Sequence, residues 1–226
     1  MKTEICGEKF NTKLEPSDWR HSAAVVGLVR YFRWSNAEYP EVEYEMADDY
    51  IKYNSEDLTE DRYLVFAEDY FSDYMHHKVI EKLLAKDELT EDEVKLCNEK
   101  LAANSICKKV FGKLKYSDEN KSAILNKISE NRADLIKETF RNGKSLYAKF
   151  ANTNSLLKEG SSDICRLLGY YVDTGRKTKT ISYNFDRSTF VCHDEKEFDF
   201  IVFAFSKTRE GLFINNNFTV KDLVKS

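Results

Sequence analysis

Proline and glycine are scarce in this sequence. Only two Pro and eight Gly occur among 226 residues, which argues against a long linker rich in either residue. No apolar run approaches the roughly 18 residues that span a bilayer, and the N-terminus lacks the apolar core of a signal peptide. Because 42% of the residues are hydrophobic, the chain can bury a core. We therefore expect a soluble, cytoplasmic protein that does not contact membranes.

Cysteines are few and widely spaced. The five residues are Cys6, Cys97, Cys107, Cys165 and Cys192, and no CxxC pair occurs. This spacing supports neither a zinc ribbon nor a thioredoxin-type redox motif. We expect free thiols, no metal site and no cofactor.

Catalytic signatures are missing as well. The sequence has no GxSxG, HExxH, P-loop or dinucleotide fingerprint. His76 and His77 are neighbours on a predicted helix and point in different directions, so a solvated surface is expected there. Residues 192–195 (CHDE) lack the spacing of a metal or nucleophile site and are predicted to form a turn. An enzyme is therefore not expected.

Charge is distributed unevenly, although the net charge is only −4. Residues 36–99 carry 20 acidic and six basic side chains, a local charge of −14. Residues 100–226 carry 23 basic and 15 acidic side chains, a local charge of +8. The first region would repel a phosphate backbone and the second would attract it. A nucleic-acid interface is therefore expected in the C-terminal half.

A first helix is predicted over residues 17–32. Ser17 or Asp18 can accept hydrogen bonds from its first N–H groups. Its apolar stripe consists of residues at helical spacing, Trp19, Ala23, Val26 and Val29, and is widened by Val25, Leu28 and Phe32. Ala23 and Gly27 leave a shallow groove that another element can approach closely. A helical Gly costs about 1 kcal/mol relative to Ala, which indicates a compensating role in packing.

The middle of the chain has a helical pattern. It extends over residues 59–117 and is interrupted by a carboxylate-rich segment at 87–93 that favours a new helix N-terminus. Another helix is expected from Ser117 towards Phe140, and residues 160–163 are predicted to cap a short helix. Residues 1–15 are expected to form a short strand or an extended arm, and a surface strand is expected within residues 42–46.

After Gly169 the hydrophobic period changes from 3.6 to 2. Strands are predicted at residues 170–172, 180–185, 189–192, 198–205 and 212–214. A capped helix is predicted to begin near Thr219. We expect one α+β domain over residues 1–226, in which the N-terminal helix and an inserted helical region pack on a C-terminal antiparallel sheet. The partly acidic insertion covers about 57–168, and the β-rich part covers about 169–218.

Two segments resemble a known family. They are DWRHSAAVVGL at residues 18–28, and FDFIVFAF at 198–205 followed by REGLFINNN at 209–217. In this order they resemble the large subunits of type I CRISPR Cascade complexes, of the I-A/I-B branch. The family usually has Asn-Ala-Gly where this chain has Ser22, Ala23 and Ala24. It often has a zinc-binding insert with paired cysteines, which this sequence lacks, so no structural metal is carried over.

The resemblance implies a non-catalytic role in DNA binding. Such a subunit recognises the protospacer-adjacent motif in duplex DNA and helps R-loop formation, while guide RNA pairing reads the target. The implied partners are crRNA-containing Cascade subunits, double-stranded target DNA and a recruited helicase-nuclease. Because the family's large subunits are typically much longer, the chain is expected to be an N-terminal part of one or a short version.

The basic segment at residues 173–180 is the most suggestive site for DNA contact. Gly175 allows close approach of the backbone. Arg176, Lys177 and Lys179 can neutralise phosphates or reach base edges. The structural alternative is an ordinary basic hairpin between two strands.

Two further segments are candidates. The amides of Asn215 and Asn216 can pair with base edges, but they can equally form the turn into the next helix. A second basic cluster consists of four side chains: Lys108, Lys109, Lys113 and Lys115. Its structural alternative is a helix with one apolar stripe and a solvated lysine face.

The uneven charge also motivates a function of another class. In this alternative the chain is a protein-interaction module without direct DNA contact. An acidic face within residues 36–99 would dock a basic partner.

Overall fold

The structure is a computed structural model that describes residues 1–7, 9–142, 156–157, 159–162, 192–207, 212–216 and 218–225. It divides into two compact units. Unit 1 consists of Met1–Tyr63 and Lys149–Ser226, and unit 2 consists of Leu64–Ala148. Within the described ranges, no helix combines the length and apolar character needed to cross a membrane.

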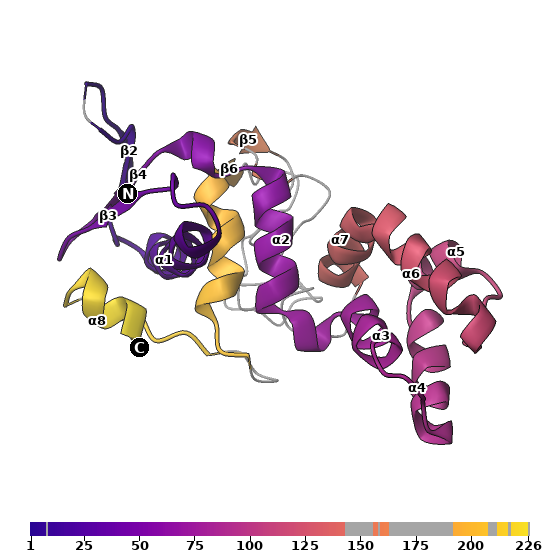
Figure 1. The fold of residues 1–226 in the computed structure, drawn as a ribbon. Coiled ribbons are helices and arrows are strands. Elements are labelled where there is room, and N and C mark those ends of the chain that lie inside the picture. The colour runs from indigo at the N-terminus through magenta and orange to yellow at the C-terminus, as the bar shows by residue number, and fades with distance from the viewer. Residues whose placement is uncertain are drawn as a thin grey trace, which may run out of the picture. The chain divides into compact units, whose positions relative to one another are not determined.

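Unit 1 contains short strands and a long helix (Figure 1). Its elements are β1 (Lys2–Glu4), β2 (Thr12–Leu14), α1 (Trp19–Glu38), β3 (Tyr44–Met46), β4 (Ile51–Tyr53), η1 (Ser55–Asp57), β5 (Gly160–Ser162), β6 (Cys192–Asp194), η6 (Lys196–Ala204) and α8 (Val220–Lys225). Helix α2 (Glu60–Tyr70) begins in unit 1 and continues into unit 2. The labels η mark 3-10 helices.

The four-stranded sheet of unit 1 is antiparallel, with the order β1-β2-β4-β3. Leu14 pairs with Ile51 and Thr12 with Tyr53, and all four side chains are buried. Alternate residues point to the other face of the sheet, so Lys13 lies opposite Lys52 at the surface. Of the two alternatives for residues 1–15, the strand is therefore the one present, and the strand predicted within residues 42–46 is confirmed.

Helix α1 is longer and more buried than the sequence predicts. It extends to Glu38, and every residue from His21 to Val29 is buried. A helix that is enclosed on all sides needs no polar face, which explains why Ala, Val and Leu fill most of this segment. The predicted apolar stripe is thus only one side of a central helix.

Gly27 of α1 lies against the backbone of η6. A Cβ built on Gly27 would overlap the carbonyl oxygen of Phe200 and lie 2.7 Å from its carbonyl carbon. The groove predicted at Ala23 and Gly27 is therefore present, and η6 occupies it. Figure 1 shows η6 as an orange coil beside α1.

The prediction of a strand at residues 198–205 is wrong, because this segment forms the 3-10 helix η6. All residues from Glu197 to Ala204 are buried. A continuous apolar run fits either a buried strand or a buried helix, and periodicity does not distinguish them. Helix η6 packs on α2 through aromatic rings. The ring centroid of Tyr63 on α2 lies 5.3 Å from that of Phe200 and 5.5 Å from that of Phe203.

A buried carboxylate joins η6 to the sheet. Glu197 is fully buried, and its Oε1 accepts a hydrogen bond of 2.6 Å from the hydroxyl of Tyr53 on β4. Lys2 of β1 places its Nζ 3.3 Å from the same oxygen. Burial, followed by the charge of Glu197, raises the pKa of Tyr53 well above its usual value. These contacts explain why a charged residue precedes the apolar part of η6.

Other expectations for the C-terminal part need correction. Residues 160–162 form strand β5 rather than a helix cap, and β5 pairs antiparallel with β6, where the sequence predicts a turn at 192–195. Residues 212–214 have no regular secondary structure. The strands predicted at 170–172, 180–185 and 189–192 lie outside the described residues, apart from Cys192 at the start of β6. The residues of β5 and β6 are mostly polar and have the composition of turns. They form strands because they pair with each other, which their own strand propensity does not predict.

The mixed content of helices and strands agrees with the expected α+β class. The expected arrangement is not confirmed, because the described four-stranded sheet comes from residues 2–53 rather than from the C-terminal part. The boundaries at about 57–168 and 169–218 stay predictions, since most of residues 143–191 lies outside the described ranges.

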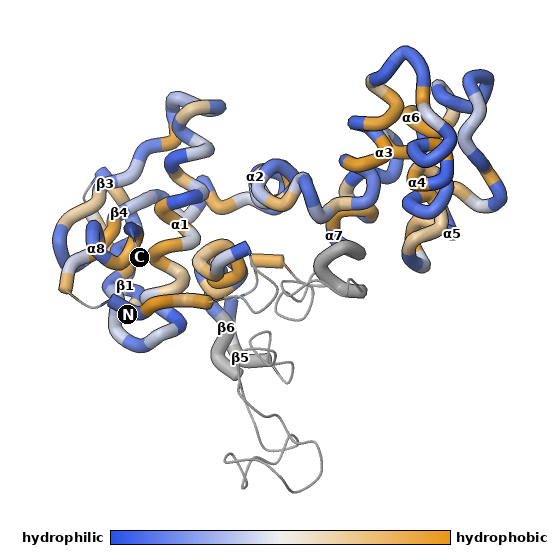
Figure 2. The backbone as a smooth tube through the Cα atoms, turned by 90° about the horizontal axis from the view of Figure 1, so that it is seen from below, coloured by the Kyte–Doolittle hydropathy of each residue, from blue (hydrophilic) through white to orange (hydrophobic). Residues whose placement is uncertain are grey.

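The described part of unit 2 is helical. Besides the end of α2, its elements are η2 (Ser72–Tyr74), α3 (His76–Leu84), α4 (Glu91–Leu101), α5 (Ser105–Phe111), η3 (Asp118–Asn120), α6 (Lys121–Glu130) and α7 (Arg132–Asn142). The carboxylate-rich segment does start a helix: Thr90 and Glu93 form a capping box at α4. Figure 2 shows apolar residues, in orange, gathered between α3, α4 and α6.

The helix predicted from Ser117 to Phe140 is divided at Asn131. The backbone N–H and the side-chain amide of Asn131 both donate to the carbonyl of Lys127, and α7 starts at the next residue. An Asn side chain that binds the backbone in this way competes with continued helix.

His77 is buried, contrary to the expected solvated surface. Its side chain lies on α3, is 1% exposed and places Nε2 2.7 Å from Oε1 of Glu68 on α2. Arg132 of α7 binds the same carboxylate oxygen at 2.5 Å and also pairs with Glu81 of α3. This network ties three helices of unit 2 together. No local pattern predicts it, because its members are up to 64 positions apart.

The cap of α1 provides a testable stability prediction. The Oδ1 of Asp18 accepts hydrogen bonds from the backbone N–H groups of Arg20 and His21 at 2.9 and 3.0 Å. We expect Asp18→Ala to lower the free energy of unfolding by about 1 kcal/mol, and Asp18→Asn to retain most of the stability because Asn caps nearly as well. Thermal unfolding followed by circular dichroism measures both. Equal losses in the two variants would contradict the capping role.

Candidate nucleic-acid interface

The principal predicted site lies outside the described residues. Gly175, Arg176, Lys177 and Lys179 all belong to the segment 163–191, of which the structure describes nothing. Their role in DNA contact therefore stays a prediction. Of the site residues expected from the sequence, the structure places only Asn215 and Asn216.

Asn215 and Asn216 lie in the extended segment that precedes α8. Asn216 helps form the turn into the helix: its Oδ1 accepts a hydrogen bond of 3.3 Å from the N–H of Phe218. Thr219 caps α8, since its Oγ1 accepts a hydrogen bond of 3.1 Å from the N–H of Asp222. Asn215 is exposed. Asn216 thus takes part in the turn, as the structural alternative predicts, and the DNA contact expected of Asn215 and Asn216 stays a prediction.

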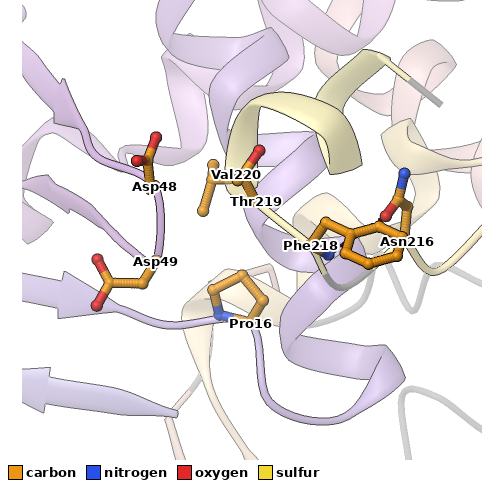
Figure 3. A pocket seen from close by; sticks show the side chains of 7 residues that line it. All are labelled: Pro16, Asp48, Asp49, Asn216, Phe218, Thr219 and Val220. Atoms are coloured by element: carbon orange, nitrogen blue, oxygen red, sulfur yellow. Dashed lines mark hydrogen bonds between the residues drawn. The ribbon is translucent and has the colours of Figure 1, made fainter.

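A small pocket lies beside Asn216 (Figure 3). Seven residues line it: Pro16, Asp48, Asp49, Asn216, Phe218, Thr219 and Val220. Figure 3 shows the two aspartates on the turn between β3 and β4, opposite the residues that lead into α8. The N–H of Val220 donates to the carbonyl oxygen of Asp48 at 2.7 Å and holds the two segments together.

The aspartates decide what this pocket can accept. Both are exposed, and Lys221 approaches Asp48 only to 3.8 Å. Carboxylates on the rim repel a phosphate backbone. Asn216 is therefore poorly placed for a phosphate contact.

Phe218 is a surface feature that sequence reasoning missed. It is 89% exposed. Its position directly before the cap of α8 is typical of a hydrophobic staple with Leu223, one turn into the helix. Leu223 is only 1% exposed, whereas Phe218 stays at the surface, so the two side chains do not form such a staple. Leu212 and Ile214 are also exposed, at 67% and 63%. No local signal in the sequence predicts this exposure, since the alternation at residues 212–214 favours a strand.

The second basic cluster lies on unit 2 at the surface. Lys108 and Lys109 occupy the last turn of α5. Lys113 lies in the turn that follows the helix, and Lys115 lies in the irregular segment after that turn. All four are exposed, and none forms an ion pair within the described part of the chain. We call these four residues the α5 lysine patch. The interpretation of α5 as a helix with one apolar stripe is correct, because Cys107, Val110 and Phe111 are buried.

The acidic region is equally exposed. In unit 1 its exposed carboxylates surround the end of α1, the strands β3 and β4 and the start of α2: Glu38, Glu41, Glu43, Glu45, Asp48, Asp49, Glu56, Glu60 and Asp61. Some of them pair with cations, as Glu41 does with Arg62 at 3.1 Å. Unit 1 thus presents a negatively charged surface formed by residues 38–61.

Among the described residues, one free cysteine, Cys6, is exposed, and the surroundings of Cys97 and Cys107 disfavour thiol chemistry. No group of three or more His, Cys, Asp or Glu side chains within them could hold a metal ion. Cys97 and Cys107 are free and buried, and burial raises the pKa of Cys107 to about 11. At neutral pH that thiol stays protonated and is a poor nucleophile. The expected absence of a metal and of an enzymatic activity stays a prediction.

Comparisons with known proteins identify the family. The family model described as CRISPR-associated protein Csx8 matches residues 10–226. No curated protein and no solved structure matches the chain. The matched region includes both segments on which the resemblance to CRISPR proteins rests. Because the family model spans nearly the whole sequence, the chain belongs to the CRISPR-associated Csx8 family.

Proposed function

We propose that the chain is a non-catalytic, DNA-binding large subunit of a type I CRISPR interference complex, or the N-terminal part of one. It recognises the protospacer-adjacent motif in duplex DNA and helps R-loop formation. The observation that carries this proposal is membership of the Csx8 family over residues 10–226. The segments at residues 18–28 and 198–217 support it through their resemblance to the large subunits of the I-A/I-B branch.

The proposal divides the work between protein and guide RNA. The guide pairs with the target strand, and the protein reads only a short motif in the duplex. We assign the motif contacts to Arg176, Lys177 and Lys179, with Gly175 allowing close approach. Asn215 is an additional candidate because its amide is exposed. The partners are crRNA-containing Cascade subunits, the target duplex and a recruited helicase-nuclease.

The test is motif-dependent binding of duplex DNA by the assembled complex. We expect Arg176→Ala/Lys177→Ala/Lys179→Ala to weaken binding and to reduce the salt dependence by about one unit of slope for every phosphate that these side chains neutralise. Removal of a base-reading side chain would also relax the motif preference, by about 1–3 kcal/mol for each base pair read. Fluorescence anisotropy with duplexes that carry or lack the motif measures these quantities.

A charge-matched variant controls for net charge. Lys82, Lys86 and Lys95 are exposed in unit 2. The variant Lys82→Ala/Lys86→Ala/Lys95→Ala removes as many positive charges as the loop variant does, from a different place. We expect this control to keep the wild-type motif preference. If the loop variant shows the same affinity, salt slope and motif preference as wild type, the loop at 173–180 is not the site.

The exposed acidic surface of residues 38–61 favours a second candidate function, a protein-interaction module without DNA contact. Its partner would be basic, and their association would weaken at high salt. Pull-down from the assembled system at low and high salt, with and without nuclease, separates the two functions. A partner retained after nuclease treatment and released by salt supports the module, and loss on nuclease treatment contradicts it.

A further inference from the structure

The α5 lysine patch is built on a rigid support. Within unit 2, Cys107, Val110 and Phe111 belong to a buried cluster, and Ile106 and Leu114 pack against it. The apolar residues of α5 therefore all face inward. What remains at the surface of this segment is charge.

The backbone after α5 is fixed as well. Gly112 has φ of 62°, a left-handed conformation that ends the helix, and its N–H donates to the carbonyl of Lys108 at 2.9 Å. The N–H of Tyr116 donates to Oδ1 of Asn98 at 2.9 Å, and the side-chain amide of Asn120 donates to the carbonyl of Lys115 at 3.1 Å. Lys113 and Lys115 are thus presented from a chain that is tied down at both ends.

None of the four lysines forms an ion pair within the part of the chain that the structure describes. Residues 101–117 contain four Lys and no Asp or Glu, although a third of all residues in the chain are charged. Elsewhere in unit 2 exposed lysines do pair with carboxylates, as Lys82 does with Asp73 at 2.7 Å and Lys86 with Glu93. Four like charges on a short segment repel one another, and a polyanion relieves that repulsion.

The chemistry of the patch fits phosphates better than protein. The central part of a protein interface is apolar or aromatic, and lysine is depleted there. The apolar side chains of α5 are buried in the core of unit 2 and contribute nothing to such a centre. Double-stranded DNA carries one negative charge for about every 1.7 Å of axis, so several phosphates lie within reach of a patch of this size.

We propose that the α5 lysine patch binds the phosphate backbone of the target duplex without regard to sequence. This inference rests on the proposed function, which supplies the duplex, and adds a second contact far in sequence from the motif-reading loop. Lysines act here as point charges that strengthen binding and leave base recognition to other residues.

The experiment compares two triple variants of the full chain, alone and in the assembled complex. Lys108→Gln/Lys109→Gln/Lys113→Gln removes three charges of the patch, and Lys82→Gln/Lys86→Gln/Lys95→Gln removes three exposed charges elsewhere in unit 2. The probe is a labelled duplex of about 30 base pairs without the motif, titrated between about 50 and 300 mM salt. Each phosphate that is no longer neutralised lowers the slope of log K against log salt by about 0.9.

We expect the patch variant to lose up to about 2.7 units of slope and at least about tenfold in affinity at about 100 mM salt. The control variant should keep the wild-type slope. Lys108→Arg/Lys109→Arg/Lys113→Arg should retain binding, since the phosphate contacts need only positive charge. All variants should melt within about 2 °C of wild type, because the substituted side chains are exposed.

Three results would overturn the inference. They are an unchanged slope in the patch variant, an equal loss in the control variant, and failure of the wild-type protein to bind the duplex. A patch variant that keeps its slope but no longer joins the other subunits would show that the surface docks an acidic protein instead. The ratio of affinities for duplexes with and without the motif tests the proposed function separately, and the patch variant should leave that ratio unchanged.

Discussion

Gly27→Ala is expected to lower the free energy of unfolding by about 3 kcal/mol. The added Cβ would overlap the carbonyl oxygen of Phe200, and backbone cannot move aside as the end of a side chain can. Helix propensity alone predicts the opposite sign, because Ala is about 1 kcal/mol more favourable than Gly inside a helix. The substitution therefore separates tertiary packing from local propensity. Urea unfolding followed by circular dichroism measures the change.

A matched substitution on the same helix serves as the control. Ala37 is exposed near the end of α1, so Ala37→Val adds volume where nothing obstructs it and should change stability by about 0.5 kcal/mol or less. If Gly27→Ala were neutral or stabilising, η6 would not pass against Gly27 in solution.

Glu68→Ala is expected to cost about 3 kcal/mol. Glu68 is 8% exposed and binds both His77 and Arg132, so its removal leaves the buried ring of His77 without this hydrogen-bond partner. Glu68→Gln keeps the shape and one acceptor oxygen and should lose less. Hydrogen exchange of α2, α3 and α7 measures the loss locally. The exposed Glu88 offers the control, since Glu88→Ala should have little effect.

The same carboxylate predicts a dependence on pH. Burial by itself would raise the pKa of Glu68, but the hydrogen bond from His77 and the charge of Arg132 outweigh it and hold the pKa below the usual 4.5. A group whose pKa is depressed by folding stabilises the folded state above its unfolded pKa. We expect this contribution to be complete above about pH 4.5 and to disappear as the pH falls through the folded value. Glu68→Gln should lack this part of the acid sensitivity, and a wild-type pH profile in the variant would contradict the assignment.

Local signals place several helix boundaries correctly. Asp18 caps α1, Thr90 with Glu93 caps α4, and Thr219 caps α8. Each of these caps depends on hydrogen bonds between residues two or three positions apart, so the local sequence is enough to predict it. The inward face of α5 likewise follows from the spacing of its apolar residues.

The segment 198–205 shows where such reasoning ends. Its run of Phe, Ile and Val fits a buried strand as well as a buried helix, and the pattern alone does not decide that it forms the 3-10 helix η6. His77 is a similar case, because its partners Glu68 and Arg132 come from other helices. In both cases, contacts between distant residues settle what the local pattern leaves open or predicts differently.

The amino-acid sequence alone was enough to establish the mixed content of helices and strands and the uneven distribution of charge. It also contained the two segments that resemble CRISPR proteins. Family membership agrees with that resemblance. Three further features emerge from the folded chain alone: Gly27 receives the backbone of η6, Asn216 stands beside two aspartates, and the α5 lysine patch projects from a fixed support. The physical reason is that composition and periodicity indicate which side chains are apolar enough to be buried. Close packing and the positions of charged side chains at the surface depend on which distant segments contact one another in the folded chain.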